Sequence, residues 1–122
     1  MKKIYHLGNC DTCQRIIKQW KPGKEIILQN IKEEPITSEQ LEQMQQLAGS
    51  YESLFSRIAL KYRALKLSEK TLTESDYRNY ILQEYTFLKR PVLILDNAIY
   101  IGNAPKTVEA ASEAIRKSRT KR

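Results

Sequence analysis

Residues 3–20 read Lys-Ile-Tyr-His-Leu-Gly-Asn-Cys-Asp-Thr-Cys-Gln-Arg-Ile-Ile-Lys-Gln-Trp. The first five are rich in branched and aromatic side chains, which predicts a short strand over 3–7. Gly8 and Asn9 break this strand, and a helix is predicted to begin around Cys10. Its apolar side chains recur at helical spacing; they are Cys13, Ile16, Ile17 and Trp20. The stretch therefore predicts a strand leading directly into a helix, with two cysteines at the junction.

The middle of the chain predicts one more strand and then several helices. Residues 25–29 have a continuous apolar centre, which is typical of a strand buried on both faces. From about 36 to 88 the pattern becomes helical. Thr37 or Ser38 is expected to cap the first of these helices, and the stretch from Thr73 to Asp76 to cap another. Between them, residues 51–67 predict a less regular helical segment whose apolar positions are Leu54, Phe55, Ile58, Tyr62 and Leu65.

The last third of the chain returns to strands. Residues 92–95 and 98–101 predict a hairpin around Asp96-Asn97, and a final helix follows Pro105. The order β-α-β, helices, β-β-α predicts an α/β fold. Its mixed four-stranded sheet has a parallel first pair, an antiparallel last pair and flanking helices. We expect a single domain over 1–122, with a helical insertion at about 36–88 between the second and third strands.

Length and composition exclude several classes of protein. The chain has 122 residues, of which 41% are hydrophobic and 29% charged, so it can bury a core. Two cysteines are too few for a disulfide-rich miniprotein, and no apolar run approaches the roughly 18 residues that span a membrane. No signal peptide is recognisable, so a cytoplasmic location without membrane contact is expected.

The net charge of +7 is concentrated at one end. Residues 116–122 hold five basic groups and no acid, which leaves 16 basic and 14 acidic groups elsewhere, a difference of +2. Such a tail is either a solvated, frayed helix end or a handle for nucleic acid or an acidic protein. The balanced body and the lack of a helix-turn-helix pattern argue against direct DNA binding.

Cys10 and Cys13 are the chemical centre of the sequence. Free N–H groups at a helix N-terminus stabilise an anion, so the Cys10 thiolate is favoured there, and Cys13 lies one turn along, in reach as a resolving thiol. A zinc site would want four soft ligands, and the chain offers two Cys and one His, so no metal is expected. Haem attachment would need His rather than Gln at position 14, and a structural disulfide is disfavoured in a reducing compartment. Two inert buried thiols remain the alternative to a redox role.

Three other residues stand out beside the cysteines. His6, four residues before Cys10, can supply a second positive group, although such a residue is often only a hydrogen-bonded strand residue. Arg57 and Arg90 would each, in isolation, be surface charges. Arg90 directly precedes Pro91 and a buried strand. A cis peptide bond before Pro91 would be rare enough to indicate a functional or structural requirement at this position.

Together these features resemble the arsenate reductase-like (ArsC/Spx) family of the thioredoxin fold, over essentially the whole chain. Three segments carry the resemblance: 5–13 with the two cysteines, 54–65 with Leu-Phe-Ser-Arg and Tyr-Arg-Ala-Leu, and 88–105 with Leu-Lys-Arg-Pro-Val, Ile-Gly and Ala-Pro. The resemblance implies a thioredoxin-like sheet with the helical insertion described above.

The resemblance also implies roles for individual residues. Cys10 matches the nucleophile that attacks an oxyanion, and His6 falls where a His supports the thiolate. Arg57 and Arg90 match two of three arginines that hold the negative charge, since Arg forks onto such oxygens. Thr12 and Asn103 complete the expected substrate-binding set.

The sequence departs from the family pattern at three places. Asn103 stands where the third arginine is expected, Gly8 replaces a Pro, and Gln14 replaces a basic residue. These departures leave arsenate open as the substrate, and a small oxyanion or thiol is the broader expectation. No bound cofactor is implied, and glutathione with glutaredoxin, or thioredoxin, would return the electrons.

A second branch of the family remains an alternative. It consists of bacterial Spx-like transcription regulators, which carry the two-cysteine motif as a redox switch and bind RNA polymerase. Cys13 and the basic tail favour this branch, whereas His6 favours the enzyme.

Overall fold

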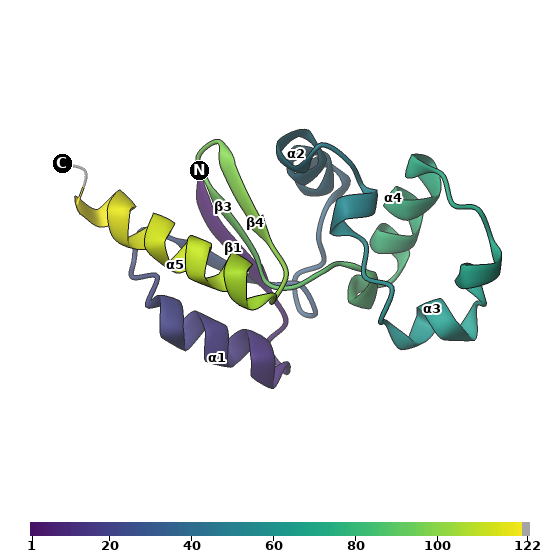
Figure 1. Ribbon diagram of the computed structural model, residues 1–122, viewed down its shortest axis with the longest axis horizontal. Coiled ribbons are helices and arrows are strands. Elements are labelled where there is room, and N and C mark those ends of the chain that lie inside the picture. The colour runs from purple at the N-terminus through teal and green to yellow at the C-terminus, as the bar shows by residue number, and fades with distance from the viewer. Residues whose placement is uncertain (121–122) are drawn as a thin grey trace. The chain divides into compact units, whose positions relative to one another are not determined.

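The computed structural model describes residues 1–120, with side chains through residue 119. The chain divides into two compact units. The sheet unit comprises Met1–Glu34 and the chain from Arg90 onward, and the helical unit comprises Pro35–Lys89. Figure 1 traces both units along the chain. That the whole chain acts as one domain stays a prediction.

The sheet unit is built on four strands, β1 (Lys2–His6), β2 (Ile27–Asn30), β3 (Val92–Leu95) and β4 (Ala98–Ile101). Their order across the sheet is β2-β1-β3-β4. The β1–β2 pair is parallel, whereas β1–β3 and β3–β4 are antiparallel. The predicted mixed α/β sheet is confirmed, and β3 and β4 have the bounds that the hairpin pattern predicted.

The register of these strands brings three chain segments to one edge of the sheet. Tyr5 near the end of β1 lies opposite Val92 at the start of β3, and Val92 lies opposite Ile101 at the end of β4. The chain after β1, the chain before β3 and the chain after β4 therefore all leave the sheet at the same end.

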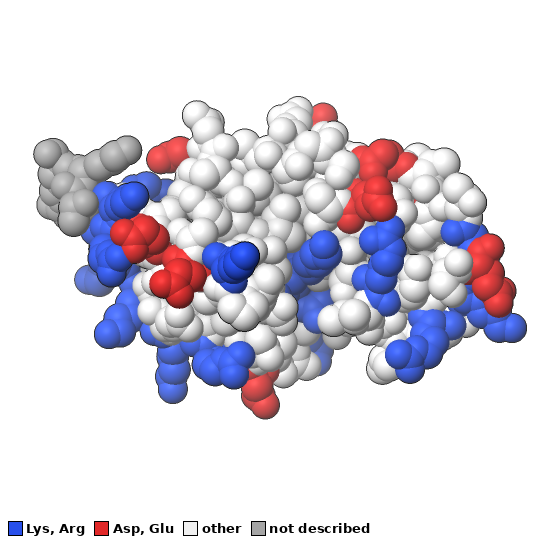
Figure 2. Space-filling view, viewed as in Figure 1, with Lys and Arg blue, Asp and Glu red and all other residues white. Residues whose placement is uncertain are grey.

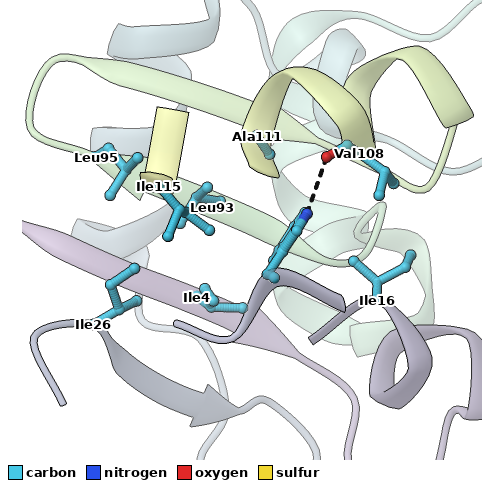
Figure 3. Close-up of a cluster of buried hydrophobic side chains, with 9 residues drawn as sticks. Ile4, Ile16, Ile26, Leu93, Leu95, Val108, Ala111 and Ile115 are labelled. Atoms are coloured by element: carbon cyan, nitrogen blue, oxygen red, sulfur yellow. Dashed lines mark hydrogen bonds between the residues drawn. The ribbon is translucent and has the colours of Figure 1, made fainter. Parts of the chain in front are cut away.

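Two helices, α1 (Asp11–Trp20) and α5 (Pro105–Thr120), pack against each other and against the sheet. Figure 3 shows their apolar side chains converging with those of β1 and β3. In this core the indole Nε1 of Trp20 donates a hydrogen bond of 3.0 Å to the backbone oxygen of Val108, which joins the two helices. The cluster consists of Ile4, Ile16, Trp20, Ile26, Leu93, Leu95, Val108, Ala111 and Ile115.

The second strand differs from the sequence prediction. The segment 25–29 was expected to be buried on both faces, but β2 runs from Ile27 to Asn30, and Ile27 and Leu28 are 62% and 46% exposed. The reason is its place in the sheet, because β2 is an edge strand whose strand neighbour is β1. The apolar run of this segment therefore does not indicate that the strand is buried on both faces.

The helical unit begins with two well-capped helices. The Thr37 side chain accepts a hydrogen bond from the Gln40 N–H at the start of α2 (Ser38–Ala48), and the Gln40 side chain accepts one from the Thr37 N–H. Thr73 and Asp76 form the same capping box at the start of α4 (Glu74–Gln83). Both predicted helix starts are confirmed, and of the two candidates for the first cap the structure has Thr37 rather than Ser38.

The segment between these helices is irregular. It contains η1 (Glu52–Leu54), α3 (Leu60–Ala64) and η2 (Leu67–Glu69), and η3 (Tyr85–Phe87) follows α4. Phe55 is fully buried and stacks on Phe87 with ring centroids 4.9 Å apart. Ile58 and Leu65, which were expected on the apolar face, are 90% and 44% exposed, because only a short helix forms here.

The predicted basic tail continues helix α5. Arg116, Lys117 and Arg119 are exposed on it, while Lys121 and Arg122 lie outside the described residues. Figure 2 shows Lys and Arg side chains gathered over the side of the sheet unit formed by α1 and α5. In residues 1–120, no helix has the length and apolar character needed to cross a bilayer.

Candidate active site

Two of the three segments at the common sheet edge are joined by a hydrogen bond. The peptide bond between Arg90 and Pro91 is cis, and the Pro91 oxygen accepts a hydrogen bond of 2.9 Å from the N–H of Gly102. Gly102 has a φ of +89°, a value that favours glycine, and Asn103 follows it on the exposed turn before α5. The predicted site residues Arg90, Pro91 and Asn103 are thus brought to one edge.

Cys10 caps the N-terminus of α1 from an extended backbone conformation. Burial by itself raises the pKa of its thiol. Hydrogen bonds from the N–H and the thiol of Cys13 and from the N–H of Thr12 lower this pKa, as does the charge of Arg90. The net pKa of Cys10 lies below its ordinary value, so the thiolate is favoured.

Cys13 is in the opposite state. Its side chain is 1% exposed, and burial together with the charge and hydrogen bond of Cys10 raises the pKa of Cys13 to about 11. A backbone hydrogen bond from Leu7 and the charge of Arg90 oppose this rise without cancelling it. The two sulfurs therefore form an asymmetric pair, in which the pKa of Cys10 is lowered and that of Cys13 is raised.

Arg90 is the cation of this site. Its charge lowers the pKa of both cysteines, so its guanidinium acts on the space around their sulfurs. The residue is partly exposed, and it directly precedes the cis Pro91. A guanidinium in this position can hold the negative oxygens of a substrate beside the nucleophile.

His6 differs from the sequence expectation of a positive group. It is the last residue of β1, and burial lowers the pKa of its imidazole, so the ring is neutral at pH 7. Its Nδ1 lies 3.4 Å from the side-chain nitrogen of Gln14, which also donates to the Leu7 oxygen at 3.3 Å. His6 thus faces the first turns of α1 without bringing a charge. The sequence could not predict this, because it does not show how far the ring is buried.

Sequence reasoning missed Asn30. Its side-chain oxygen accepts hydrogen bonds from the N–H groups of Gly8 at 3.0 Å and Lys32 at 3.2 Å. Asn30 ends β2, and the parallel register places it beside His6. A polar residue closing a strand next to β1 was the signal that could have identified it.

Arg57 belongs to the helical unit. Its Nη2 lies 2.8 Å from a Glu52 carboxylate oxygen and donates to the Tyr77 hydroxyl at 2.9 Å. The Glu52 hydrogen bond is the main cause that raises the pKa of Arg57. The guanidinium is therefore held in one orientation while its side chain stays 45% exposed.

Within the part of the chain that the structure describes, no three His, Cys, Asp or Glu side chains come together to hold an ion. The site brings together the two cysteine sulfurs and the charge of Arg90.

Comparison with solved structures identifies the fold. An arsenate reductase from Vibrio cholerae matches with a TM-score of 0.75 and 17% identity, covering 90% of this chain and 96% of that one. An ArsC-related protein from Brucella melitensis matches with a TM-score of 0.69 and 25% identity, covering 89% and 92%. The thioredoxin-like sheet expected from the resemblance is therefore confirmed.

Sequence comparison identifies the family. No curated protein sequence matches the chain. The model of the ArsC family, by contrast, matches residues 5–111. This span includes both cysteines, the helical unit, Arg90 and the first turns of α5. The chain belongs to the ArsC family.

Proposed function

We propose that this protein is an arsenate reductase-like thiol oxidoreductase in which Cys10 is the nucleophile and Cys13 the resolving thiol. The observation that carries the proposal is the opposite state of the two sulfurs. The pKa of Cys10 is lowered and that of Cys13 is raised to about 11, although they lie one helical turn apart. Cys10 loses its proton more easily than a free cysteine and can attack a substrate, whereas Cys13 keeps its proton and can act in a later step.

The first step is attack on an oxyanion such as arsenate. The Cys10 thiolate donates an electron pair to arsenic and forms a sulfur–arsenic bond, while one arsenate hydroxyl takes a proton from solvent and leaves as water. Arg90 holds the charge of the remaining oxygens, because its guanidinium already acts on the sulfur that attacks. No metal is required for this step.

The second step uses Cys13. The charge of Cys10 is one of the causes that raise the pKa of Cys13, and this charge disappears once Cys10 is bonded to arsenic. Cys13 then loses its proton more easily and attacks the Cys10 sulfur. The sulfur–arsenic bond breaks with its electron pair on arsenic, so arsenite leaves and a Cys10–Cys13 disulfide remains.

The disulfide must be reduced for another cycle. We propose that glutathione with glutaredoxin, or thioredoxin, supplies the two electrons and two protons that restore both thiols. This places the protein in a reducing compartment, and we propose the cytoplasm of a bacterium.

Three further substrate contacts belong to the proposal. The backbone N–H of Thr12 is one of the groups that lower the pKa of Cys10, and Asn103 lies at the sheet edge that carries Arg90. The Arg57 guanidinium is held by Glu52 and Tyr77 in a fixed orientation that suits an oxyanion. His6, neutral at pH 7, is proposed as a proton-transfer group rather than a source of charge.

The direct test is arsenate-dependent NADPH oxidation, coupled in parallel to glutathione/glutaredoxin and to thioredoxin. We expect turnover with one of the two donors and its loss in Cys10→Ser. Turnover that persists in this variant, or none with either donor, would contradict the proposed enzyme.

The placement of the two cysteines one helical turn apart also suits a redox switch, so an Spx-like regulator is the second candidate. In that case the Cys10–Cys13 disulfide would alter a surface that binds RNA polymerase. Pull-down from cell extract with oxidised and with reduced protein tests this, and the regulator is contradicted if no polymerase subunit is retained in either state.

A further inference from the structure

The loop between β1 and α1 delivers Cys10 to the helix N-terminus, and one side chain from the neighbouring strand fixes it. Asn30 is the last residue of β2 and pairs in parallel with His6, the last residue of β1. The Ile31 N–H donates to the His6 oxygen at 2.9 Å, so the two strand ends are tied together. Asn30 is therefore placed where the chain turns toward Cys10.

A single oxygen of Asn30 serves two loops. Its Oδ1 accepts from the N–H of Gly8, after β1, at 3.0 Å, and from the N–H of Lys32, after β2, at 3.2 Å. The Asn30 backbone oxygen also accepts from Glu33 and Glu34 at 3.1 and 2.8 Å. The hydrogen bonds from Lys32, Glu33 and Glu34 order the turn that follows Asn30. The hydrogen bond from Gly8 connects this ordered turn to the loop before Cys10.

Gly8 is needed because of Asn30. A Cβ atom at position 8 would lie 2.3 Å from Nδ2 and 3.0 Å from Cγ of Asn30. The φ angle of Gly8 is not positive, so its backbone conformation alone does not require glycine. The missing side chain thus makes room for the Asn30 amide, while the flexibility of glycine leaves the loop dependent on that hydrogen bond.

The loop then closes on the helix. The Cys10 N–H donates to the Leu7 oxygen at 3.1 Å, and the Gln14 side chain donates to the same oxygen at 3.3 Å. Cys10 is two residues beyond Gly8, so a shift of the Gly8 peptide moves the Cys10 sulfur relative to the N–H groups of Thr12 and Cys13 at the start of α1, which lower its pKa.

We propose that Asn30 is a positioning residue for Cys10: its side-chain oxygen fixes the Gly8 peptide and thereby holds the Cys10 sulfur against the N-terminus of α1. The inference rests on the proposed function in taking Cys10 as the nucleophile. Its test measures the thiolate directly and needs no turnover.

The test is a double-mutant cycle of Asn30→Ala and Gly8→Ala, read out as the pH dependence of Cys10 alkylation by iodoacetamide. Asn30→Ala removes the acceptor, and Gly8→Ala displaces it by the clash. Each is expected to slow alkylation at pH 7 by roughly three- to tenfold, the range expected for a lost hydrogen bond, and to move the profile to higher pH.

The combined variant distinguishes a direct relation from two separate effects. With Asn30 already truncated, the Cβ at position 8 has nothing to displace, so the double variant should react no more slowly than Asn30→Ala alone. Asn79→Ala is the matched control, because it makes the same truncation at an exposed position of α4. It should leave the profile unchanged.

Three outcomes would count against the proposal. If the variants melt earlier but keep the wild-type alkylation profile, Asn30 is only structural and the proposal is overturned. Additive slowing in the double variant also overturns it. Wild-type Cys10 that reacts like a free thiol would overturn this inference and the proposed nucleophile together. If Asn30→Ala does not fold, Gly8→Ala still decides, because it leaves Asn30 in the chain.

Discussion

Cys10 and Cys13 lie one helical turn apart at the N-terminus of α1, and the interaction between their side chains shifts their pKa values in opposite directions. Burial contributes most to the raised pKa of Cys13, and this interaction adds to it while lowering the pKa of Cys10, so the two cysteines differ although they are neighbours. The backbone N–H groups of Thr12 and Cys13 in the first turn of the helix also lower the pKa of Cys10.

Alkylation of the two cysteines should therefore occur in different pH ranges. Cys10 should react with iodoacetamide with a midpoint below the value of about 8.5 for a free cysteine, and Cys13 should stay protected until near pH 11. Fragmentation mass spectrometry of residues 4–15 assigns each modification, with Cys10→Ser as the control. Equal reactivity of both thiols would contradict the asymmetric pair.

The side chain of Cys13 should matter to Cys10 even when no disulfide forms. Cys13→Ala removes the donor, so the pKa of Cys10 should rise, whereas Cys13→Ser keeps a hydroxyl donor and should change it less. The backbone N–H of residue 13 is present in both variants. The two alkylation profiles measure the difference, and identical profiles would mean that the backbone N–H groups alone activate Cys10.

Local rules explain what could be predicted of the fold. The capping boxes at Thr37 and Thr73 and the hairpin turn at Asp96 depend on residues within a few positions of each other. The exposure of Ile27 on β2 and of Ile58 near α3 does not depend on residues close to them in the sequence. It depends on which strands and helices lie next to them, and the apolar pattern of a segment does not contain that information.

The residues of the candidate site likewise fall into those that local sequence predicts and those that depend on the fold. Cys10 and Cys13 were predicted because the strand, the motif and the helix are consecutive in the sequence. The contact of Asn30 with Gly8 spans 22 residues and requires the β1–β2 register, and the neutrality of His6 requires its burial. Neither can be read from spacing.

Arg90 should bind the substrate oxygens through its fork and stabilise the thiolate through its charge. Arg90→Lys keeps the charge, so the pKa of Cys10 should change little, but loss of charge-assisted hydrogen bonds worth about 1.5–3 kcal/mol should weaken oxyanion binding by roughly 10- to 150-fold. The coupled NADPH assay should show this as a higher KM for arsenate. An unchanged KM would exclude Arg90 from substrate binding.

The core that holds α1 against α5 depends on Trp20. Trp20→Phe removes the hydrogen bond to the Val108 oxygen and leaves a small cavity, so it should lower the free energy of unfolding by about 1–3 kcal/mol. Urea denaturation followed by circular dichroism measures this, since the variant lacks the only tryptophan. Ile58→Ala is the control. Its side chain is 90% exposed, so the change should stay within about 0.5 kcal/mol.

His6 provides a test that depends on pH. Because burial lowers its pKa, the imidazole Hε1 resonance of this single histidine should titrate with a midpoint below about 6.5. The unfolded chain then binds a proton at a higher pH than the folded one. The His6 contribution to stability is therefore fully present above pH 6.5 and is lost as the pH falls through the folded pKa. This part of the pH dependence should disappear in His6→Gln. A midpoint at or above 6.5 would instead show a charged His6 near neutral pH and return it to the role of a cation beside Cys10.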